Sequence, residues 1–217
     1  MNNNVFKYVF KYIMIGNPSV GKSCLLNQFL NNQFSEEYEV TVGVEFGAKT
    51  VETPDKSRVK LQVWDTAGQE NFKSVIRAYY RSTAVAVVVF DITVRSSFEA
   101  VQDWIAECRA NGNPEAVLVL VGNKTDLAGK RVVTREEGES FAKKNGMLYF
   151  ETSAKSNEGV EEMFTRSAEA VLGKIAAGVI DPKVESYGVK LGVQAPPSSL
   201  KRAALTQPKE GGGCCKK

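Results

Sequence analysis

Apolar runs alternate along the chain with longer segments in which apolar side chains recur every three or four residues. The runs AVAVVVF at Ala84–Phe90 and VLVLV at Val117–Val121 are apolar throughout, which is typical of strands covered on both faces. The same pattern predicts further strands at Tyr8–Ile15, Val44–Glu52, Val59–Trp64 and Leu148–Glu151. It predicts helices over Lys22–Leu30, Ser96–Ala110, Thr134–Lys144 and Gly159–Ile175.

Local signals refine these elements. A turn at Pro54–Ser57 joins two of the strands into a hairpin, and Ser96 and Thr134 are predicted helix N-caps, with Glu137 completing a capping box. The succession of strands and helices predicts an α/β fold. We expect a doubly wound, mostly parallel six-stranded sheet with one antiparallel strand and helices on both faces. Ligands of such sheets bind outside the carboxyl ends of the strands.

Composition separates a folded body from a tail. Of the 217 residues, 43% are hydrophobic and 24% are charged, so the chain can bury a full core. From about Ala177 onward, Gly, Pro, Ser, Lys and Gln dominate and the helical periodicity ends. We therefore predict one domain over residues 1–176 and a flexible tail over residues 177–217.

Charge and residue usage disfavour several classes of protein. The net charge is +3, but the part from Lys183 onward carries a surplus of five positive charges, so the preceding part is close to −2. A mildly acidic body argues against nucleic-acid binding. The absence of histidine excludes histidine-based acid–base catalysis, and the four cysteines lack zinc-site spacing, which favours a reducing compartment. We expect neither a signal peptide nor a membrane-spanning helix.

A glycine-rich loop follows the first predicted strand and opens the first helix. Its sequence, GNPSVGKS from Gly16 to Ser23, matches the P-loop pattern, in which backbone N–H groups and a helix N-terminus surround phosphate oxygens. Lys22 then lies at the β- and γ-phosphates and the Ser23 hydroxyl binds Mg²⁺. The predicted phosphate-side residues are Gly16, Ser19, Val20, Gly21, Lys22, Ser23 and Cys24.

Two later segments indicate the base. The segment NKTD, which ends at Asp126, follows a buried strand. A carboxylate there can accept hydrogen bonds from N1–H and the 2-amino group of guanine, which adenine does not offer. The stem of a lysine can cover the base, and SAK, after the last strand, is the expected second guanine-side loop. The predicted base-side residues are Asn123, Lys124, Asp126, Ser153, Ala154 and Lys155.

Candidate residues for binding the metal and the attacking water follow the strand VKLQVW. Asp65 there can hold Mg²⁺ through water, Gly68 offers an N–H to a γ-phosphate, and Gln69 can orient the water. Thr41, in the polar loop before the hairpin, can supply a second hydroxyl ligand when a γ-phosphate is present, and an ordinary loop residue without a metal role is the alternative at this position. The predicted metal ligands are Ser23, Thr41 and Asp65, and the predicted catalytic residues are Gln69, Lys22 and Thr41.

These motifs together resemble the Ras-like small GTPases and, more specifically, the Rab family. The family's order and approximate spacing are kept over about Tyr8–Lys174 by GNPSVGKSCLLNQF, TVGVEFG, KLQVWDTAGQE, RAYYRS, VFDIT, GNKTD and ETSAK. Within that family the chain is most similar to type four, with types two and fourteen as close relatives. The resemblance implies a P-loop G domain that binds GTP or GDP with Mg²⁺.

The resemblance assigns roles to further residues. Phe34 would lie beside the guanine and Tyr38 over the γ-phosphate, while Glu36–Gly43 and Gly68–Tyr80 would form two switch regions. Packing in the core remains an alternative for the three rings of the implied effector-binding triad, which are Phe46, Trp64 and Tyr79. The chain departs from the family at Asn71, where Rabs commonly carry arginine, and this puts contacts with regulators in doubt.

The chain ends in GGGCCKK. A terminal lysine does not suit a C-a-a-X motif, whereas the paired Cys214 and Cys215 resemble the Rab ending that receives two geranylgeranyl groups. Two lipid chains are the number that stable anchoring requires, and basic tail residues would add attraction to an anionic cytoplasmic leaflet. Two unmodified thiols on an exposed tail are the alternative.

The resemblance also implies partners and a cellular role. The partners would be an exchange factor, a GDP-dissociation inhibitor, the prenylation enzymes, effectors, and a GTPase-activating protein that supplies the arginine absent from Glu36–Gly43. We expect a monomer on the cytoplasmic face of endosomal or Golgi-derived membranes, exchanging with the cytosol and regulating vesicle traffic.

Two other functions stay open at this point. The first is a guanine-nucleotide-dependent scaffold with little hydrolysis, for which Pro18 in the P-loop leaves room, although Gln69 favours hydrolysis. The second is a P-loop kinase or ATPase, which Asp126 disfavours.

Overall fold

The computed structural model describes residues 5–36, 41, 43–68 and 73–192. The strands are β1 (Tyr8–Ile15), β2 (Val44–Glu52), β3 (Arg58–Thr66), β4 (Val85–Asp91), β5 (Val117–Asn123), β6 (Leu148–Thr152) and β7 (Val189–Leu191). The α-helices are α1 (Lys22–Asn31), α2 (Lys73–Tyr80), α3 (Arg95–Glu99), α4 (Val101–Asn111), α5 (Arg135–Asn145) and α6 (Val160–Ala176). Short 3₁₀ helices lie at η2 (Thr125–Lys130) and η3 (Glu185–Tyr187).

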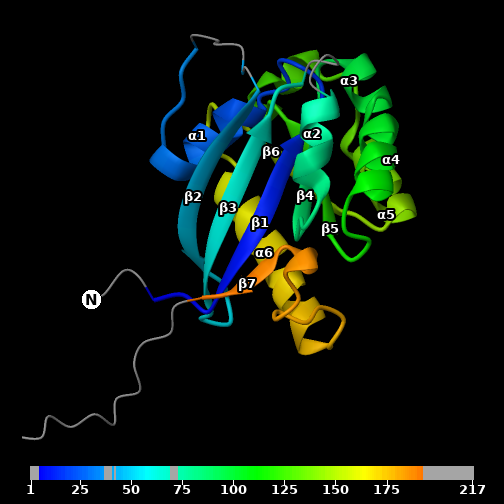
Figure 1. The fold of residues 1–217 in the computed structure, drawn as a ribbon. Coiled ribbons are helices and arrows are strands. Elements are labelled where there is room, and N and C mark those ends of the chain that lie inside the picture. Colours follow the sequence, from blue (N-terminus) through cyan, green and yellow to red (C-terminus); the bar gives the residue numbers. More distant parts are fainter. Residues whose placement is uncertain (1–4, 37–40, 42, 69–72, 193–217) are drawn as a thin grey trace, which may run out of the picture.

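The strands form one sheet in the order β2-β3-β1-β4-β5-β6, with β7 beside β1 (Figure 1). The pairs from β3 through β6 are parallel, whereas β2 is antiparallel to β3 and β7 is antiparallel to β1. The predicted α/β fold with a doubly wound, mostly parallel sheet is confirmed. The sheet has seven strands in place of the six that were predicted.

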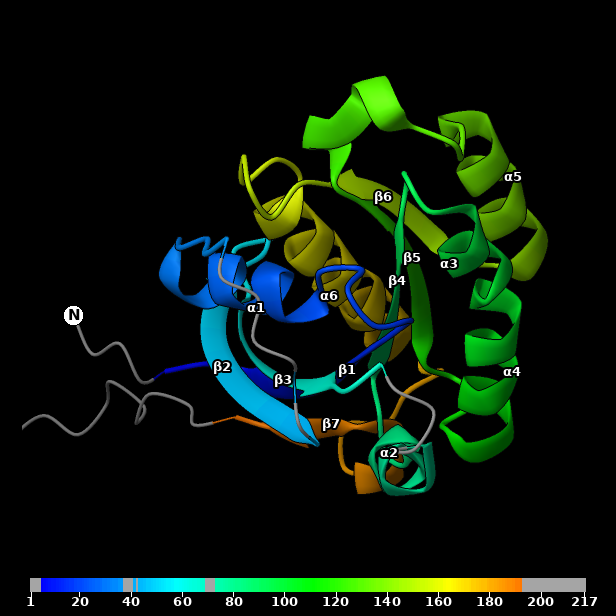
Figure 2. The same cartoon turned by 90° about the horizontal axis from the view of Figure 1, so that it is seen from above.

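Helices cover both faces of the sheet (Figure 2). On one face, Phe29 of α1 and Phe164 of α6 stack with ring centroids 3.8 Å apart. On the other, Ile76 of α2, Trp104 of α4 and Ala142 of α5 pack against β4 and β5. Every residue of β4 is buried, as a strand covered on both faces requires. No described helix combines the length and the apolar character needed to cross a bilayer.

The helices differ from the prediction in two places. The helix predicted over Ser96–Ala110 is divided into α3 and α4, and it begins one residue earlier, so Ser96 is not its N-cap. The helix α2 was not predicted, because its apolar face is only two turns long. By contrast, α5 begins with the predicted capping box, in which Thr134 and Glu137 bond reciprocally to each other's backbone N–H.

The segment after α6 corrects the predicted extent of the irregular tail. Residues 178–192 were expected to lack regular structure, but they form η3 and β7. β4 pairs with β1 only from Tyr12 onward, and β7 takes up the rest of that edge by pairing with Tyr8–Phe10. Ile180 and Val189 are fully buried against the core. A three-residue strand carries too short a pattern to be predicted. Residues 193–217 lie outside the described part, and a flexible tail there stays a prediction.

This packing leads to a test of β7. We expect Val189→Ala to lower the free energy of unfolding by about 2 kcal/mol, because it empties a fully buried site. The matched control is Leu191→Ala in the same strand. Leu191 is 56% exposed, so its truncation should change the free energy of unfolding by less than about 0.5 kcal/mol. Urea denaturation of both variants makes the comparison, and equal stabilities would show that β7 does not pack as described.

Candidate nucleotide and magnesium site

The predicted P-loop joins β1 to α1 at the carboxyl end of the sheet (Figure 2). Gly16 and Gly21 have φ of 139° and 96°, which L side chains rarely adopt. A Cβ at Gly16 would overlap the carbonyl of Val89, and one at Gly21 would overlap the side-chain amide of Asn123. The loop therefore needs glycine at both positions, for backbone conformation and for the close approach of β4 and β5.

Lys22 is buried at the first turn of α1. Its ammonium donates to the carbonyl oxygens of Gly16 at 2.9 Å and Asn17 at 3.0 Å, so the side chain folds back over the loop. Burial lowers the pKa of Lys22 to about 8, although the carboxylate of Asp65 acts in the opposite direction. A buried cation held mainly by neutral carbonyls is poised to be stabilised by an anion.

The three predicted metal ligands lie together. The Ser23 and Thr41 hydroxyl oxygens are 2.6 Å apart, and Ser23 also donates to Asp65 Oδ2. The other carboxylate oxygen, Asp65 Oδ1, is the one buried side-chain nitrogen or oxygen without a hydrogen-bond partner in the described ranges. Burial raises the pKa of Asp65 to about 6, even though the Ser23 hydrogen bond and Lys22 act to lower it.

These residues fit Mg²⁺. The described residues hold no cluster of three or more His, Cys, Asp or Glu. Mg²⁺ prefers oxygen ligands and keeps several of its waters. Two hydroxyls and one carboxylate with an orphaned oxygen supply that kind of donor set at the first turn of α1.

The two predicted base-side loops also come together. Ser153 is buried and donates to Asp126 Oδ1 at 2.6 Å, while the Asp126 carboxylate stays exposed to solvent. Asn123 ties this region to the P-loop by donating to the carbonyl of Val20 at 2.9 Å. Lys155 pairs with Glu36 at 2.7 Å, so the second loop reaches the start of the first predicted switch.

Further residues anchor the site without belonging to a predicted set. Asp91, at the carboxyl end of β4, pairs with Lys124 at 2.7 Å, and Lys124 also donates to the carbonyl of Ser19. Trp104 of α4 donates to the Asn17 side chain at 2.8 Å. Asp91 directly follows an apolar run in the sequence, as Asp65 follows its strand, so Asp91 could have been predicted as a site residue on the same grounds. Trp104 lies within a helix and has no such signal.

The structure describes some of the remaining predicted residues, whereas others lie outside its described part. Val20 and Ala154 are buried, Cys24 is half-buried, and Phe34 is 38% exposed. Gly68 packs against the P-loop so closely that a Cβ there would overlap the backbone of Asn17 and Pro18. The residues Tyr38, Gln69, Asn71, Cys214 and Cys215 lie outside the described part, so the roles predicted for them stay predictions.

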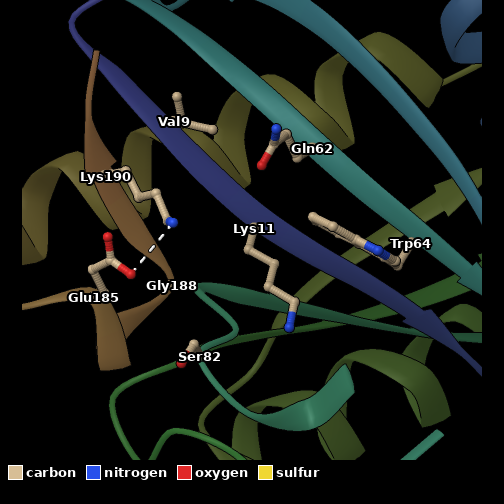
Figure 3. Close-up of a pocket in the computed structure, with 8 residues that line it drawn as sticks. All are labelled: Val9, Lys11, Gln62, Trp64, Ser82, Glu185, Gly188 and Lys190. Atoms are coloured by element: carbon tan, nitrogen blue, oxygen red, sulfur yellow. Dashed lines mark ion pairs between the residues drawn. The ribbon is translucent and has the colours of Figure 1, made fainter. Parts of the chain in front are cut away.

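Two of the predicted effector-binding rings form a pair on the hairpin. Phe46 and Trp64 are opposite each other in β2 and β3, with ring centroids 4.9 Å apart, and Phe46 is 56% exposed. Trp64 borders a hollow of about 340 Å³ between β1, β3 and the segment of η3 and β7, into which Lys11 and Lys190 also face (Figure 3). Tyr79 lies at the edge of the core beside α4 and is half-buried.

A family model described as the Ras family matches residues 11–173. The matched part covers well over half of the chain and includes the P-loop, the Ser23–Thr41–Asp65 cluster and both base-side loops. The chain therefore belongs to the Ras family, and so to the small GTPases, which act as switches and bind guanine nucleotides, typically with Mg²⁺.

Proposed function

We propose that this protein is a Rab-type switch that binds GTP with Mg²⁺, hydrolyses it slowly and regulates vesicle traffic. The observation that carries the proposal is the meeting of Ser23, Thr41 and Asp65 beside the buried Lys22. It brings a hydroxyl from a switch, a hydroxyl from the P-loop and a strand-end carboxylate to one point. This is the arrangement that a metal-bound triphosphate requires.

The chain's own residues have distinct roles in this proposal. The Lys22 ammonium, which donates to two loop carbonyls, would bind oxygens of the β- and γ-phosphates, and the backbone N–H groups of the P-loop would hold the β-phosphate. Bound Mg²⁺ would neutralise phosphate charge. Gln69 would orient the attacking water, as predicted from the sequence.

The geometry also supports a switch. Thr41 precedes β2 and contacts the P-loop through Ser23, while Gly68 follows β3 and packs on Asn17 and Pro18. Both switch segments thus touch the loop that holds the phosphates. Loss of the γ-phosphate would release contacts in each segment, and a partner that reads Phe46 and Trp64 nearby would sense the change.

The proposed function also requires membrane attachment and protein partners. We propose that Cys214 and Cys215 each receive a geranylgeranyl group, and that the protein cycles between the cytosol and the cytoplasmic face of endosomal or Golgi-derived membranes. An exchange factor, an activating protein, a GDP-dissociation inhibitor and effectors would act on it. Within the Rab family we propose a protein of type four, or of the related types two and fourteen, on the sequence resemblance alone.

Single-turnover GTP hydrolysis tests the proposal. We expect wild type to hydrolyse GTP at a rate on the order of 10⁻⁴ s⁻¹ without an activating protein. Gly68→Ala should slow hydrolysis by at least about tenfold while GDP binding persists, because the added methyl group forces the second switch away from the P-loop. The control is Gly129→Ala, where a Cβ meets nothing within 4 Å. Tight GTP binding with no hydrolysis, even with an activating protein, would favour the scaffold function.

A further inference from the structure

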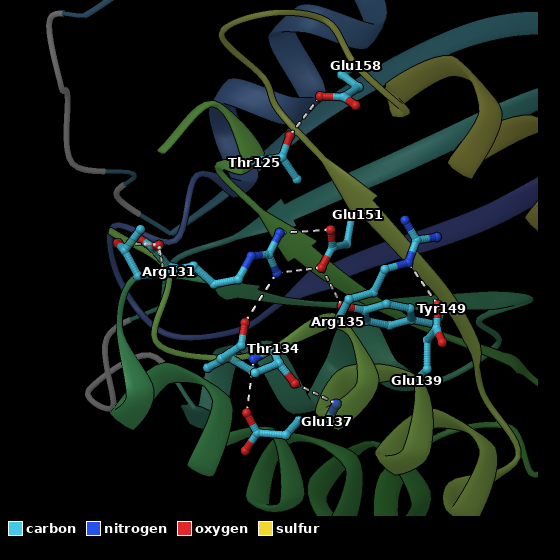
Figure 4. Close-up of polar contacts among 12 residues, drawn as sticks. Thr125, Arg131, Thr134, Arg135, Glu137, Glu139, Tyr149, Glu151 and Glu158 are labelled. Carbon is cyan, nitrogen blue, oxygen red and sulfur yellow. Dashed lines mark hydrogen bonds and ion pairs between the residues drawn. The ribbon is translucent and has the colours of Figure 1, made fainter. Parts of the chain in front are cut away.

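Arg131 and Glu151 form a two-pronged ion pair beside β6, the last strand in the order of the sheet (Figure 4). The guanidinium nitrogens Nη1 and Nη2 donate to Glu151 Oε1 at 2.7 Å and Oε2 at 2.9 Å. The two side chains are only 23% and 11% exposed, so the pair is shielded from water and screened little by salt. Nothing in the nucleotide motifs includes Arg131.

The position of this pair in the chain connects the two base-side loops. Arg131 follows η2 directly, and η2 carries Asp126 in its first turn. Glu151 lies in β6, two residues before Ser153. The pair therefore joins the end of one loop to the start of the other, and the hydrogen bond from Ser153 to Asp126 lies between them.

The loop that carries Asp126 has little packing of its own. Every residue from Asp126 to Lys130 is exposed, and the chain becomes fully buried again only at Val133. Arg131 also donates to the Val133 carbonyl at 3.2 Å, so its guanidinium links the end of the loop both to the core and to β6. An exposed loop keeps its geometry through the contacts at its ends. At the start of the loop, Lys124 pairs with Asp91 and Thr125 donates to Glu158. At its end, Arg131 is held by Glu151.

Glu151 is itself held by neighbours. The Tyr149 hydroxyl donates to Glu151 Oε1 at 3.0 Å, and the Tyr149 ring lies on Gly138 of α5, where a Cβ would overlap it. The Glu151 carboxylate is therefore held by a second side chain of β6 as well as by Arg131.

We infer that Arg131 and Glu151 are positioning residues for base recognition, which hold the Asp126 carboxylate against Ser153 in the orientation that guanine requires. The inference rests on the proposed role of Asp126 in reading the base. Without the pair, the exposed loop would sample other positions, and the two hydrogen bonds from N1–H and the 2-amino group would form less often.

The test compares GDP with IDP, which lacks the 2-amino group, on the full-length protein. Fluorescent analogues of both nucleotides report their dissociation rates. We expect Arg131→Ala to release GDP about tenfold faster than wild type does. The ratio of the IDP dissociation rate to the GDP dissociation rate should decrease several-fold, because the preference for the 2-amino group weakens. Arg131→Lys keeps the charge but loses the two parallel hydrogen bonds of the guanidinium. Its GDP dissociation rate and its ratio of dissociation rates should lie between those of wild type and Arg131→Ala.

The control is Arg135→Ala, which removes the neighbouring but exposed Arg135–Glu139 pair and should leave the ratio unchanged. A merely structural role would lower the melting temperature of Arg131→Ala without changing the ratio. An unchanged ratio in a folded Arg131→Ala variant overturns the inference while the proposed function stands. A wild-type protein without preference for GDP over ADP would instead overturn the proposed function itself.

Discussion

A Lys22→Met variant is expected to bind GTP and GDP at least about a hundredfold more weakly than wild type, while its fold remains intact. The ammonium is buried at the first turn of α1 and lies over the P-loop through the carbonyls of Gly16 and Asn17. Methionine has a similar length and no charge, so it fills the same volume but offers nothing to a phosphate oxygen.

The stability of the same variant should move in the other direction. Burial lowers the pKa of Lys22 to about 8, which means that the nucleotide-free fold bears a cost for this charge. Methionine removes that cost, so the melting temperature of nucleotide-free protein should be equal to or above that of wild type. Loss of affinity without loss of stability separates a role in phosphate binding from a role in folding.

Isothermal titration with GDP and Mg²⁺, together with thermal unfolding, makes both comparisons. The control is Lys143→Met, at an exposed position in the last turn of α5, which should leave nucleotide affinity unchanged. Near-normal affinity in the Lys22→Met variant would show that the P-loop does not hold phosphate through this ammonium.

The site was predictable where its chemistry is local in the sequence. The P-loop, NKTD and SAK are short motifs whose residue types and spacing indicate their chemistry. The order of strands and helices predicts that all three lie at the carboxyl ends of the strands. The structure accordingly brings Ser153 to Asp126, and Ser23 to both Asp65 and Thr41. The capping box of α5 was predictable for the same reason.

Each contact that was missed involves a residue outside the short motifs. Trp104 donates to Asn17, and Arg131 pairs with Glu151, but neither Trp104 nor Arg131 belongs to a motif that would mark it in the sequence. The strand β7 was missed because pairing with β1, and not the propensity of three residues, makes it a strand. Residues of this kind support the site without touching the expected ligand.

Asp126→Ala should reduce the preference for GTP over ATP by at least about a hundredfold. Ser153 occupies one side of the carboxylate at Oδ1, and the carboxylate is otherwise exposed and available to a base. Guanine presents two donors to it, whereas adenine presents an acceptor at N1 and no 2-amino group. Removing the carboxylate leaves both bases without a partner, so the discrimination should be lost mainly through weaker GTP binding.

Competition between GTP and ATP for wild type and Asp126→Ala, in the presence of Mg²⁺, is therefore the most direct measurement. We expect strong selection of GTP by wild type and little selection by the variant, with ATP affinity almost unchanged. An Asp126→Ala protein that still selects GTP as wild type does would contradict recognition of guanine by this carboxylate.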